Sequence, residues 1–172
     1  MRMSVVLSTY NAPAWLEKVI WGYSVQTHQD FELVIADDGS KLETARLLAR
    51  MGDETGIRIQ HVWHEDRGFR KCEILNKAIL ASKSDYLVFS DGDCVPRADF
   101  LETHARFSEP GHYLSGGLVR LPMQLSEQLG REDIACQRMA SVPWLVRQGQ
   151  PLNKKLLLMT PGSRGGAILD RL

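Results

Sequence analysis

Tyr86-Leu-Val-Phe-Ser-Asp-Gly-Asp-Cys-Val-Pro96 combines the pattern of a buried strand with a pair of acidic residues. The alternating aromatic and aliphatic side chains of its first half are typical of a strand. The strand runs directly into Asp91 and Asp93, with Gly92 between them. Two like charges at the end of a buried strand are unfavourable unless a cation lies beside them. The segment alone is compatible with a divalent metal site or with a solvated Asp-Gly turn, and the rest of the chain favours the metal site.

Strand and helix patterns alternate four times from the amino terminus to this segment. Strands are expected at 4–8, 31–36, 57–63 and 86–90, with helices over about 14–27, around Ala45, Leu48 and Ala49, and over about 70–82. Pro96 is expected to be the first residue of the following helix. Such alternation predicts an α/β fold with a mostly parallel, doubly wound sheet and helices on both faces.

The pattern weakens after Phe107. A strand over 113–119, interrupted by two glycines, and a helix over 132–147, interrupted by Pro143, are the expected elements there. No secondary structure is predicted for the residues beyond them.

Composition excludes several classes of protein. The hydrophobic share of 44% in 172 residues is enough for a globular core, and 21 basic residues against 21 acidic ones give no excess for binding nucleic acid. No run of about 18 apolar residues could span a membrane, and the first apolar run is too short for a signal peptide. The three cysteines, Cys72, Cys94 and Cys136, show no disulfide or metal-ligand spacing. We therefore expect a cytoplasmic protein.

Polar residues follow three of the expected strands: Ser8-Thr9-Tyr10-Asn11, Asp37-Asp38, and Asp91-Gly92-Asp93. A parallel sheet brings the carboxyl ends of its strands to one edge, where a nucleotide binds in such folds. The chain has no glycine-rich phosphate-binding motif. A metal ion on Asp93 would take that role instead.

The chain resembles the family-2 glycosyltransferases, which have the Rossmann-like GT-A fold. Four segments match in the family's order and spacing: Ser-Val-Val-Leu-Ser-Thr-Tyr-Asn, Phe-Glu-Leu-Val-Ile-Ala-Asp-Asp-Gly-Ser, the ten residues from Arg70 to Ile79, and Asp91-Gly-Asp93. The resemblance covers about residues 3 to 100. The segment His64-Glu-Asp-Arg-Gly-Phe-Arg70 is similar to the subgroup that builds bacterial surface polysaccharides and lipopolysaccharide cores.

The resemblance implies a nucleotide-sugar donor, with UDP as the nucleotide. Ser8, Thr9 and Tyr10 would flank the base and ribose, although a tyrosine at a strand end is also common in other contexts. Asp38 would accept the N3–H of uracil, and its alternative role is to cap a turn. Arg70 would face the uracil or the diphosphate, and its alternative is an ordinary surface arginine.

The resemblance also implies a metal ion. Asp91 would meet the ribose hydroxyls and contribute to the metal site, and Asp93 would coordinate Mn²⁺ or Mg²⁺ bridging the two phosphates. Asp66 is either a further residue of this site or an ordinary loop acid.

An inverting sugar transfer needs a base that removes the proton of the acceptor hydroxyl. The candidates after Asp93 are Glu132, Asp133 and Asp170, and an acidic first turn of a helix is the simpler explanation of the first two. We therefore expect residues 1–108 to bind the donor and residues 109–172 to begin an incomplete acceptor side of a longer enzyme. A glycan or lipid-linked acceptor would place it at the inner face of the cell membrane.

Two alternatives are open on these residues. One is a non-catalytic nucleotide-sugar-binding module, since no base is evident. The other is a haloacid-dehalogenase-type phosphatase, because Asp91-Gly-Asp-Cys-Val95 fits that motif. In that fold, however, the nucleophile strand comes first and a later acidic pair completes the site, whereas here Asp37 and Asp38 precede it.

Overall fold

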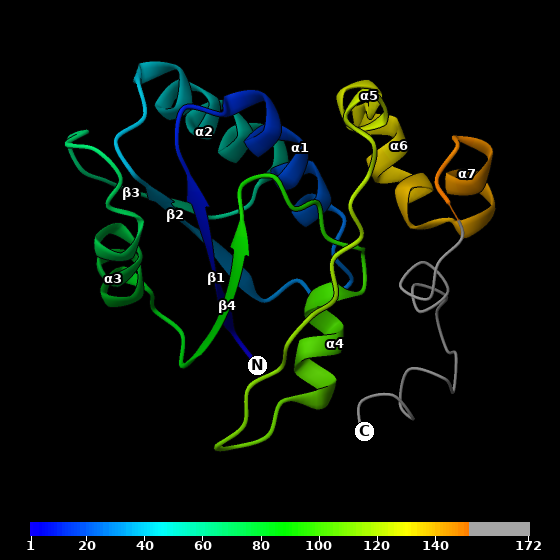
Figure 1. Cartoon of the computed structure of the whole chain (residues 1–172). Coiled ribbons are helices and arrows are strands. Elements are labelled where there is room, and N and C mark those ends of the chain that lie inside the picture. The colour runs from blue at the N-terminus through cyan, green and yellow to red at the C-terminus, as the bar shows by residue number, and fades with distance from the viewer. Residues whose placement is uncertain (152–172) are drawn as a thin grey trace. The chain divides into compact units, whose positions relative to one another are not determined.

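The computed structural model describes residues 1–151, and the chain divides into two compact units between Arg106 and Phe107 (Figure 1). The first unit runs from Met1 to Arg106 and the second begins at Phe107. No helix among the described residues is both long and apolar enough to cross a membrane.

The first unit is built on a parallel sheet. Its strand order in the described residues is β3-β2-β1-β4, and every neighbouring pair is parallel. The strands are β1 (Met3–Thr9), β2 (Phe31–Asp37), β3 (Ile59–Trp63) and β4 (Tyr86–Asp91). All four lie within two residues of the ranges expected from the sequence, and the predicted α/β architecture is confirmed.

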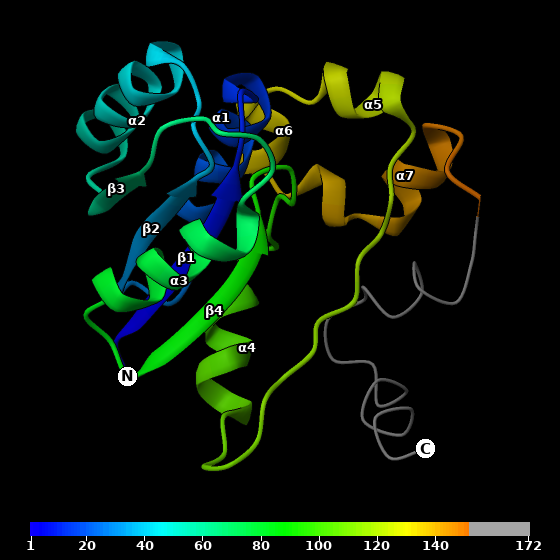
Figure 2. The same cartoon turned by 60° about the vertical axis from the view of Figure 1, so that its left-hand side comes forward.

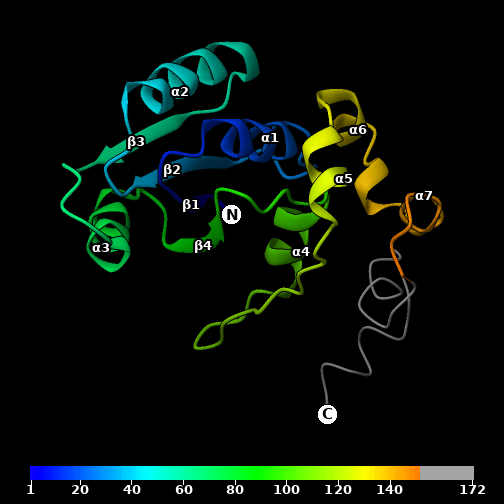
Figure 3. The same cartoon turned by 45° about the horizontal axis from the view of Figure 1, so that its top comes forward.

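Helices cover both faces of this sheet (Figures 1 and 3). Helices α1 (Pro13–Ser24) and α2 (Leu42–Thr55) pack on one face, and α3 (Lys71–Ala81) packs on the other against β1, β2 and β3. Helix α4 (Phe100–Phe107) contributes Leu101 to the core on the α1 side. Burial on both faces explains why β1 and β2 are almost continuously apolar in sequence.

The sheet alternates its side chains between two cores. Met3, Val5 and Leu7 of β1 point toward α1 and α2, whereas Val6 points toward α3. The larger core contains these buried residues: Met3, Val5, Leu7, Leu16, Val19, Ile20, Tyr23, Leu33, Ile35, Leu47, Leu48, Met51, Val88 and Leu101. The smaller one consists of Val6, Val34, Ala36, Ile74 and Ala78.

Three expectations for this unit are wrong in detail. Strand β4 is not buried on both faces: it is last in the described strand order, and Phe89 is 53% exposed while Val88 is 2% exposed. On α2, Ala49 is exposed, and Met51 completes the buried stripe instead. Pro96 does not begin a helix. It lies in the loop before α4, where its ring packs so closely on Gly22 that a Cβ there would come within 2.7 Å of Pro96 Cδ.

The described part of the second unit contains short helices joined by loops (Figure 2). They are α5 (Met123–Gln128), α6 (Arg131–Ala135), a 3-10 helix (Arg138–Ala140) and α7 (Val142–Arg147). Leu125 and Leu145 form a small core, against which Val119, Leu121 and Trp144 pack. The expected strand over 113–119 is absent, and Tyr113 is 90% exposed. The single helix expected over 132–147 is three shorter ones, because Gln137 is left-handed and a new helix begins at Val142, with Pro143 in its first turn.

Candidate functional site

A cleft of about 520 Å³ lies at the carboxyl ends of the strands, within the first unit. The loops after β1, β2, β3 and β4 all contribute to it, as expected for an open α/β sheet. Of the residues expected to bind a nucleotide or a metal ion, six line this cleft: Ser8, Thr9, Tyr10, Asp38, Asp91 and Asp93. The structure therefore brings together residues that are up to 85 positions apart in the sequence.

Hydrogen bonds join the ends of β1 and β4. Ser8 pairs in register with Asp91, and its hydroxyl donates a hydrogen bond of 2.7 Å to Asp91 Oδ1. The Gly92 N–H then donates to the Ser8 carbonyl at 2.8 Å. A Cβ on Gly92 would lie 2.8 Å from that same oxygen, so a side chain there would force the two backbones apart. Glycine between the two acids thus holds Asp91 and Asp93 against the end of β1.

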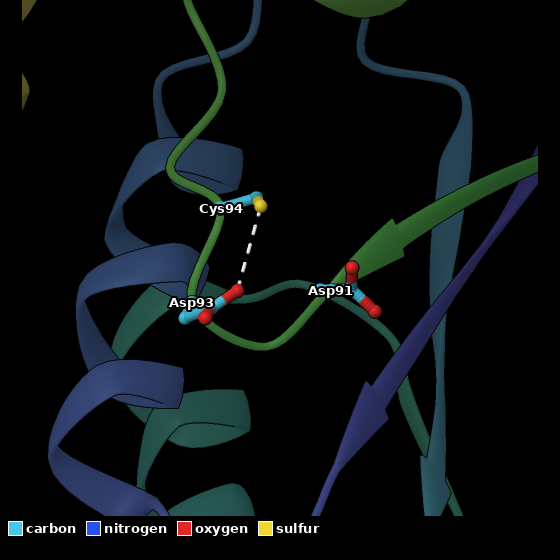
Figure 4. Close-up of side chains that lie close together, drawn as sticks. All are labelled: Asp91, Asp93 and Cys94. Carbon is cyan, nitrogen blue, oxygen red and sulfur yellow. Dashed lines mark hydrogen bonds between the residues drawn. The ribbon is translucent and has the colours of Figure 1, made fainter. Parts of the chain in front are cut away.

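Asp91 and Asp93 are both exposed at the turn after β4 (Figure 4). The ammonium group of Lys71 lies 2.7 Å from Asp91 Oδ1, and this hydrogen bond, together with that of Ser8, lowers the pKa of Asp91. Asp91, Asp93 and Cys94 offer ligand atoms within 4.8 Å of one another. Burial and the nearby Asp93 raise the pKa of the Cys94 thiol to about 11, so it stays a neutral and poor ligand. The two carboxylates are the oxygen ligands that Mg²⁺ and Mn²⁺ prefer.

Thr9 also fits a ligand-binding role. Its hydroxyl is buried at the cleft, and no hydrogen-bond partner for Oγ1 occurs among the described residues. Buried hydroxyls are normally hydrogen-bonded. A bound polar ligand would supply the missing partner.

The end of β2 is buried, and its carboxylate is hydrogen-bonded. Asp37 is fully buried, and its carboxylate accepts hydrogen bonds from the Ser40 N–H and from His61 Nε2, both at 2.8 Å. Burial acts to raise the pKa of Asp37, but the bonds from His61 and Ser40 outweigh it and the pKa is lowered. Asp38 is 7% exposed, and it reaches the cleft. Gly39 has φ +97°, and a Cβ there would meet the backbone of Asp66 at 2.6 Å.

Tyr10 and Asp66 connect the loops after β1 and β3. The Tyr10 hydroxyl donates a 2.8 Å hydrogen bond to Asp66 Oδ2, and this contact raises the pKa of Tyr10. Bonds from the Gly68 N–H and from Tyr10 lower the pKa of Asp66. Asp66 also lines the cleft. This position agrees with the first of its two interpretations from the sequence, a further residue of the site.

Arg70 precedes α3 and is not among the described residues that line the cleft. The guanidinium bonds to Glu73 Oε2 at 2.8 Å and to the Glu65 carbonyl at 3.1 Å. Its backbone N–H donates to Asp38 Oδ2 at 2.9 Å. Direct contact between the Arg70 side chain and a ligand stays a prediction.

Sequence reasoning missed three residues here. Lys71 and Phe69 line the cleft, and Phe69 is 88% exposed. His64 is buried and donates to Asp38. His64 directly follows β3, so the rule that singled out the ends of the other strands could have found it.

The acids expected as candidate bases have other partners or lie outside the described residues. Asp133 accepts the Gly130 N–H at 3.1 Å, and Arg138 pairs with both Asp133 and Glu132. This arrangement agrees with the simpler explanation, an acidic first turn of helix α6. Asp170 lies outside the described residues. A catalytic role for any of the three stays a prediction.

Curated relatives match a little over half of the chain. Validoxylamine A glucosyltransferase of Streptomyces hygroscopicus subsp. jinggangensis is 35% identical over 91 residues, which are 52% of this chain and 21% of that protein. Chondroitin synthase of Escherichia coli is 28% identical over 103 residues, 59% of this chain and 15% of the synthase. The chain thus spans less than a third of the length of these relatives.

Solved structures share the fold. TarS 1–349 of S. aureus gives a TM-score of 0.55 at 21% identity, over 62% of this chain and 32% of that one. The mannosyltransferase PcManGT of Pyrobaculum calidifontis gives 0.57 at 23% identity, over 63% and 33%. These matches confirm the GT-A fold expected from the sequence.

The family model described as glycosyl transferase family 2 matches residues 4–160. This match extends from β1 through both units, and it supports neither the phosphatase nor the non-catalytic alternative. The chain therefore belongs to glycosyl transferase family 2.

Proposed function

We propose that this chain is the donor-binding portion of a glycosyltransferase that moves a sugar from a nucleotide-sugar, a UDP-sugar, to a hydroxyl of a glycan or lipid-linked acceptor. One observation carries the proposal: Ser8, Asp38 and the Asp91–Asp93 pair come from three strand ends and line a single cleft. Membership of the family supplies the reaction class. A polysaccharide acceptor would be made in the cytoplasm at the inner face of the membrane.

The nucleotide would bind along the ends of β1 and β2. Asp38 presents a buried, oriented carboxylate to the cleft, and such a group accepts a hydrogen bond from the N3–H of uracil. Ser8, Thr9 and Tyr10 would flank the base and ribose, with the unpartnered Thr9 hydroxyl available to the ligand. TarS has been crystallised with UDP-GlcNAc and with UDP, which agrees with uridine as the nucleoside.

The diphosphate would bind near the end of β4. Asp93, with Asp91, would hold Mn²⁺ or Mg²⁺, and Lys71 would place a further positive charge close to the phosphates. A bound divalent ion supplies Lewis-acid stabilisation of the nucleoside diphosphate leaving group. PcManGT was crystallised with GDP-Man and Mn²⁺. Mn²⁺ and Mg²⁺ both suit two carboxylate ligands, and binding measurements distinguish them.

The transfer step needs a base within reach of the acceptor hydroxyl, and inversion at the sugar follows if that base activates direct attack. Residues 1–108 would bind the donor, and residues from 109 onward would begin the acceptor side. Glu132, Asp133 and Asp170 are the bases that this chain offers, and the pairing of the first two with Arg138 argues for a base supplied elsewhere.

Isothermal titration with UDP, CDP and GDP tests donor binding. We expect UDP to bind in the presence of Mn²⁺ and much more weakly with a chelator, because Asp91 and Asp93 repel a diphosphate unless a cation intervenes. Asp38→Ala should weaken UDP most, and Asp93→Ala should remove the metal dependence. Equal UDP affinity with Mn²⁺ and with chelator would contradict the metal site as proposed.

A transfer assay with a radiolabelled UDP-sugar and a panel of glycan acceptors tests the division of roles. A missing general base lowers rates by about 10²–10⁴, so we expect donor binding with little transfer. Turnover by this chain at about ten per second, an ordinary enzyme rate, would refute the donor-portion proposal. Alanine at Glu132, Asp133 and Asp170 in turn would then identify the base.

A further inference from the structure

Asp38 is held by two hydrogen bonds that come from different elements. Its Oδ1 accepts from His64 Nε2 at 2.7 Å, and its Oδ2 accepts from the Arg70 N–H at 2.9 Å. The side chain is almost completely buried, and Asp38 lines the cleft. Each carboxylate oxygen has two acceptor positions, so both oxygens keep capacity for a further donor.

His64 is itself fixed from its other side. It is 7% exposed, and its Nδ1 lies 3.3 Å from the ammonium group of Lys77 on α3. An ammonium group only donates, so Lys77 can hydrogen-bond to Nδ1 only if Nδ1 carries a lone pair. Glu73 Oε1 lies farther away, 3.8 Å from Nδ1. With Lys77 as the donor to Nδ1, Nε2 carries the ring proton and donates it to Asp38. Glu73 Oε1 in turn accepts from Lys77 at 2.8 Å, one helical turn away.

We propose that His64 is a positioning residue for Asp38, that Lys77 fixes the tautomer of His64, and that this pair makes the cleft select a nucleobase with a ring N–H. The proposal rests on the proposed function insofar as Asp38 contacts the base. A carboxylate whose direction is fixed by two donors accepts from the N3–H of uracil. The same carboxylate faces an acceptor, and repels it, when the base is cytosine. The ratio of the affinities for UDP and CDP therefore measures this contact at nearly constant ligand size.

The selectivity arises from the fixed orientation of the Asp38 carboxylate, which has no N–H to offer to a base. Without the hydrogen bond from His64, the Asp38 carboxylate keeps only the one from the Arg70 N–H and can rotate away from the base. A second partner that sets the tautomer and ring orientation of a histidine is a known way of controlling what the histidine holds. Lys77 is 45% exposed, so its removal tests this mechanism with little disturbance of the core.

Titration calorimetry with UDP and CDP in Mn²⁺ measures the selectivity. We expect His64→Ala to reduce the preference for UDP over CDP by about tenfold, which equals the loss of about one hydrogen bond to a charged group. His64→Gln should retain part of the preference, because its amide can still donate to Asp38. Lys77→Met should reduce it by a few-fold, and the matched control Lys83→Met, at the lysine just after α3, should not change it. An unchanged preference in folded Lys77→Met and His64→Ala would overturn the proposal.

Nitrogen-15 NMR of the imidazole rings gives a second readout that needs no nucleotide. We expect His64 of the unmodified chain to carry its proton on Nε2 at neutral pH, and Lys77→Met to give a mixture of tautomers. A proton on Nδ1 in the unmodified chain would overturn the proposal even if UDP binds. If the tautomer is as expected but neither UDP nor CDP binds, the proposed function fails and the selectivity with it, so the two failures are distinguishable.

Discussion

The ends of β2 and β4 both place two carboxylates after an apolar strand, but in opposite environments. Asp37 and Asp38 are 0% and 7% exposed, and their partners are the histidines His61 and His64. The Asp91 side chain is 55% exposed, and its charged partner is Lys71. Asp93 is exposed as well.

The difference shows how burial decides the chemistry of an acidic pair. Buried carboxylates need fixed hydrogen-bond donors, which orient them for recognition by a further donor. Exposed carboxylates stay ionised in water and can exchange one cationic partner for another. The β2 end thus suits a nucleobase, and the β4 end suits a metal ion and a diphosphate.

The largest effect is expected from removing the buried acid. Asp37→Ala leaves His61 and the Ser40 N–H without their acceptor, and should lower the free energy of unfolding by about 2–4 kcal/mol. Asp91→Ala, at the exposed end, should lower it by less than about 1 kcal/mol. Urea unfolding followed by circular dichroism measures both, and equal losses would contradict the contrast in burial.

Removing a metal ligand should have the next largest effect. Mutation of a residue that only hydrogen-bonds to a metal ligand weakens metal binding by about 10–100-fold. Asp93→Asn changes a ligand itself, so it should weaken Mn²⁺ binding by at least about 100-fold. Electron paramagnetic resonance of free Mn²⁺ measures this without turnover. Asp37→Asn is the matched control at the buried end, and it should leave Mn²⁺ affinity unchanged if folded.

Gly92→Ala tests whether the β4 end depends on close backbone packing. The added Cβ would lie 2.8 Å from the Ser8 carbonyl oxygen, and relieving that contact should cost about 1–3 kcal/mol of stability. Gly116→Ala is the control, since a Cβ there meets no atom within 4 Å. Thermal unfolding that gives the same midpoint for both variants would show that the β4 end tolerates a side chain.

Lys71→Met should have a smaller effect, with opposite signs for two ligands. The ammonium group of Lys71 competes with a metal ion for Asp91. Because exposed ion pairs are worth up to about 1 kcal/mol, its removal should let Mn²⁺ alone bind about twofold to fivefold more tightly. UDP should bind more weakly, because a positive charge near the diphosphate is lost. Calorimetry of each ligand tests this, and a parallel weakening of both would contradict the competition.

The smallest effect concerns acid stability. The pKa of Asp37 is lower in the folded chain than its ordinary value of about 4. Its stabilising contribution is therefore complete above that value and is lost as the pH falls through the lower folded pKa. Unfolding free energies measured between pH 6 and 3 should decrease less steeply for Asp37→Asn than for the unmodified chain, and identical slopes would contradict this.

The sequence by itself determined the parallel α/β architecture and the acidic strand ends. Apolar runs at β1 and β2 and the helical spacing between them are local patterns, and residues such as Asp38 and Asp93 follow the strands directly. Because parallel strands end at one edge, the cleft followed from local information alone. The strand order did not, and β4 is exposed at Phe89 because it is last in the described order.

Tertiary structure alone decided which groups surround each acid. His64 contacts Asp38, 26 positions away in the sequence, and Lys71 contacts Asp91, 20 positions away. The periodicity of a helix or a strand does not relate residues that are so far apart in sequence. The second unit shows the same limit, since residues 113–119 have a strand-like composition but form no strand. A strand needs a neighbour to satisfy its backbone groups, and each carboxylate needs a partner from a distant segment: the loop after β3 for Asp38 and helix α3 for Asp91. Both are supplied by the folded chain rather than by adjacent residues.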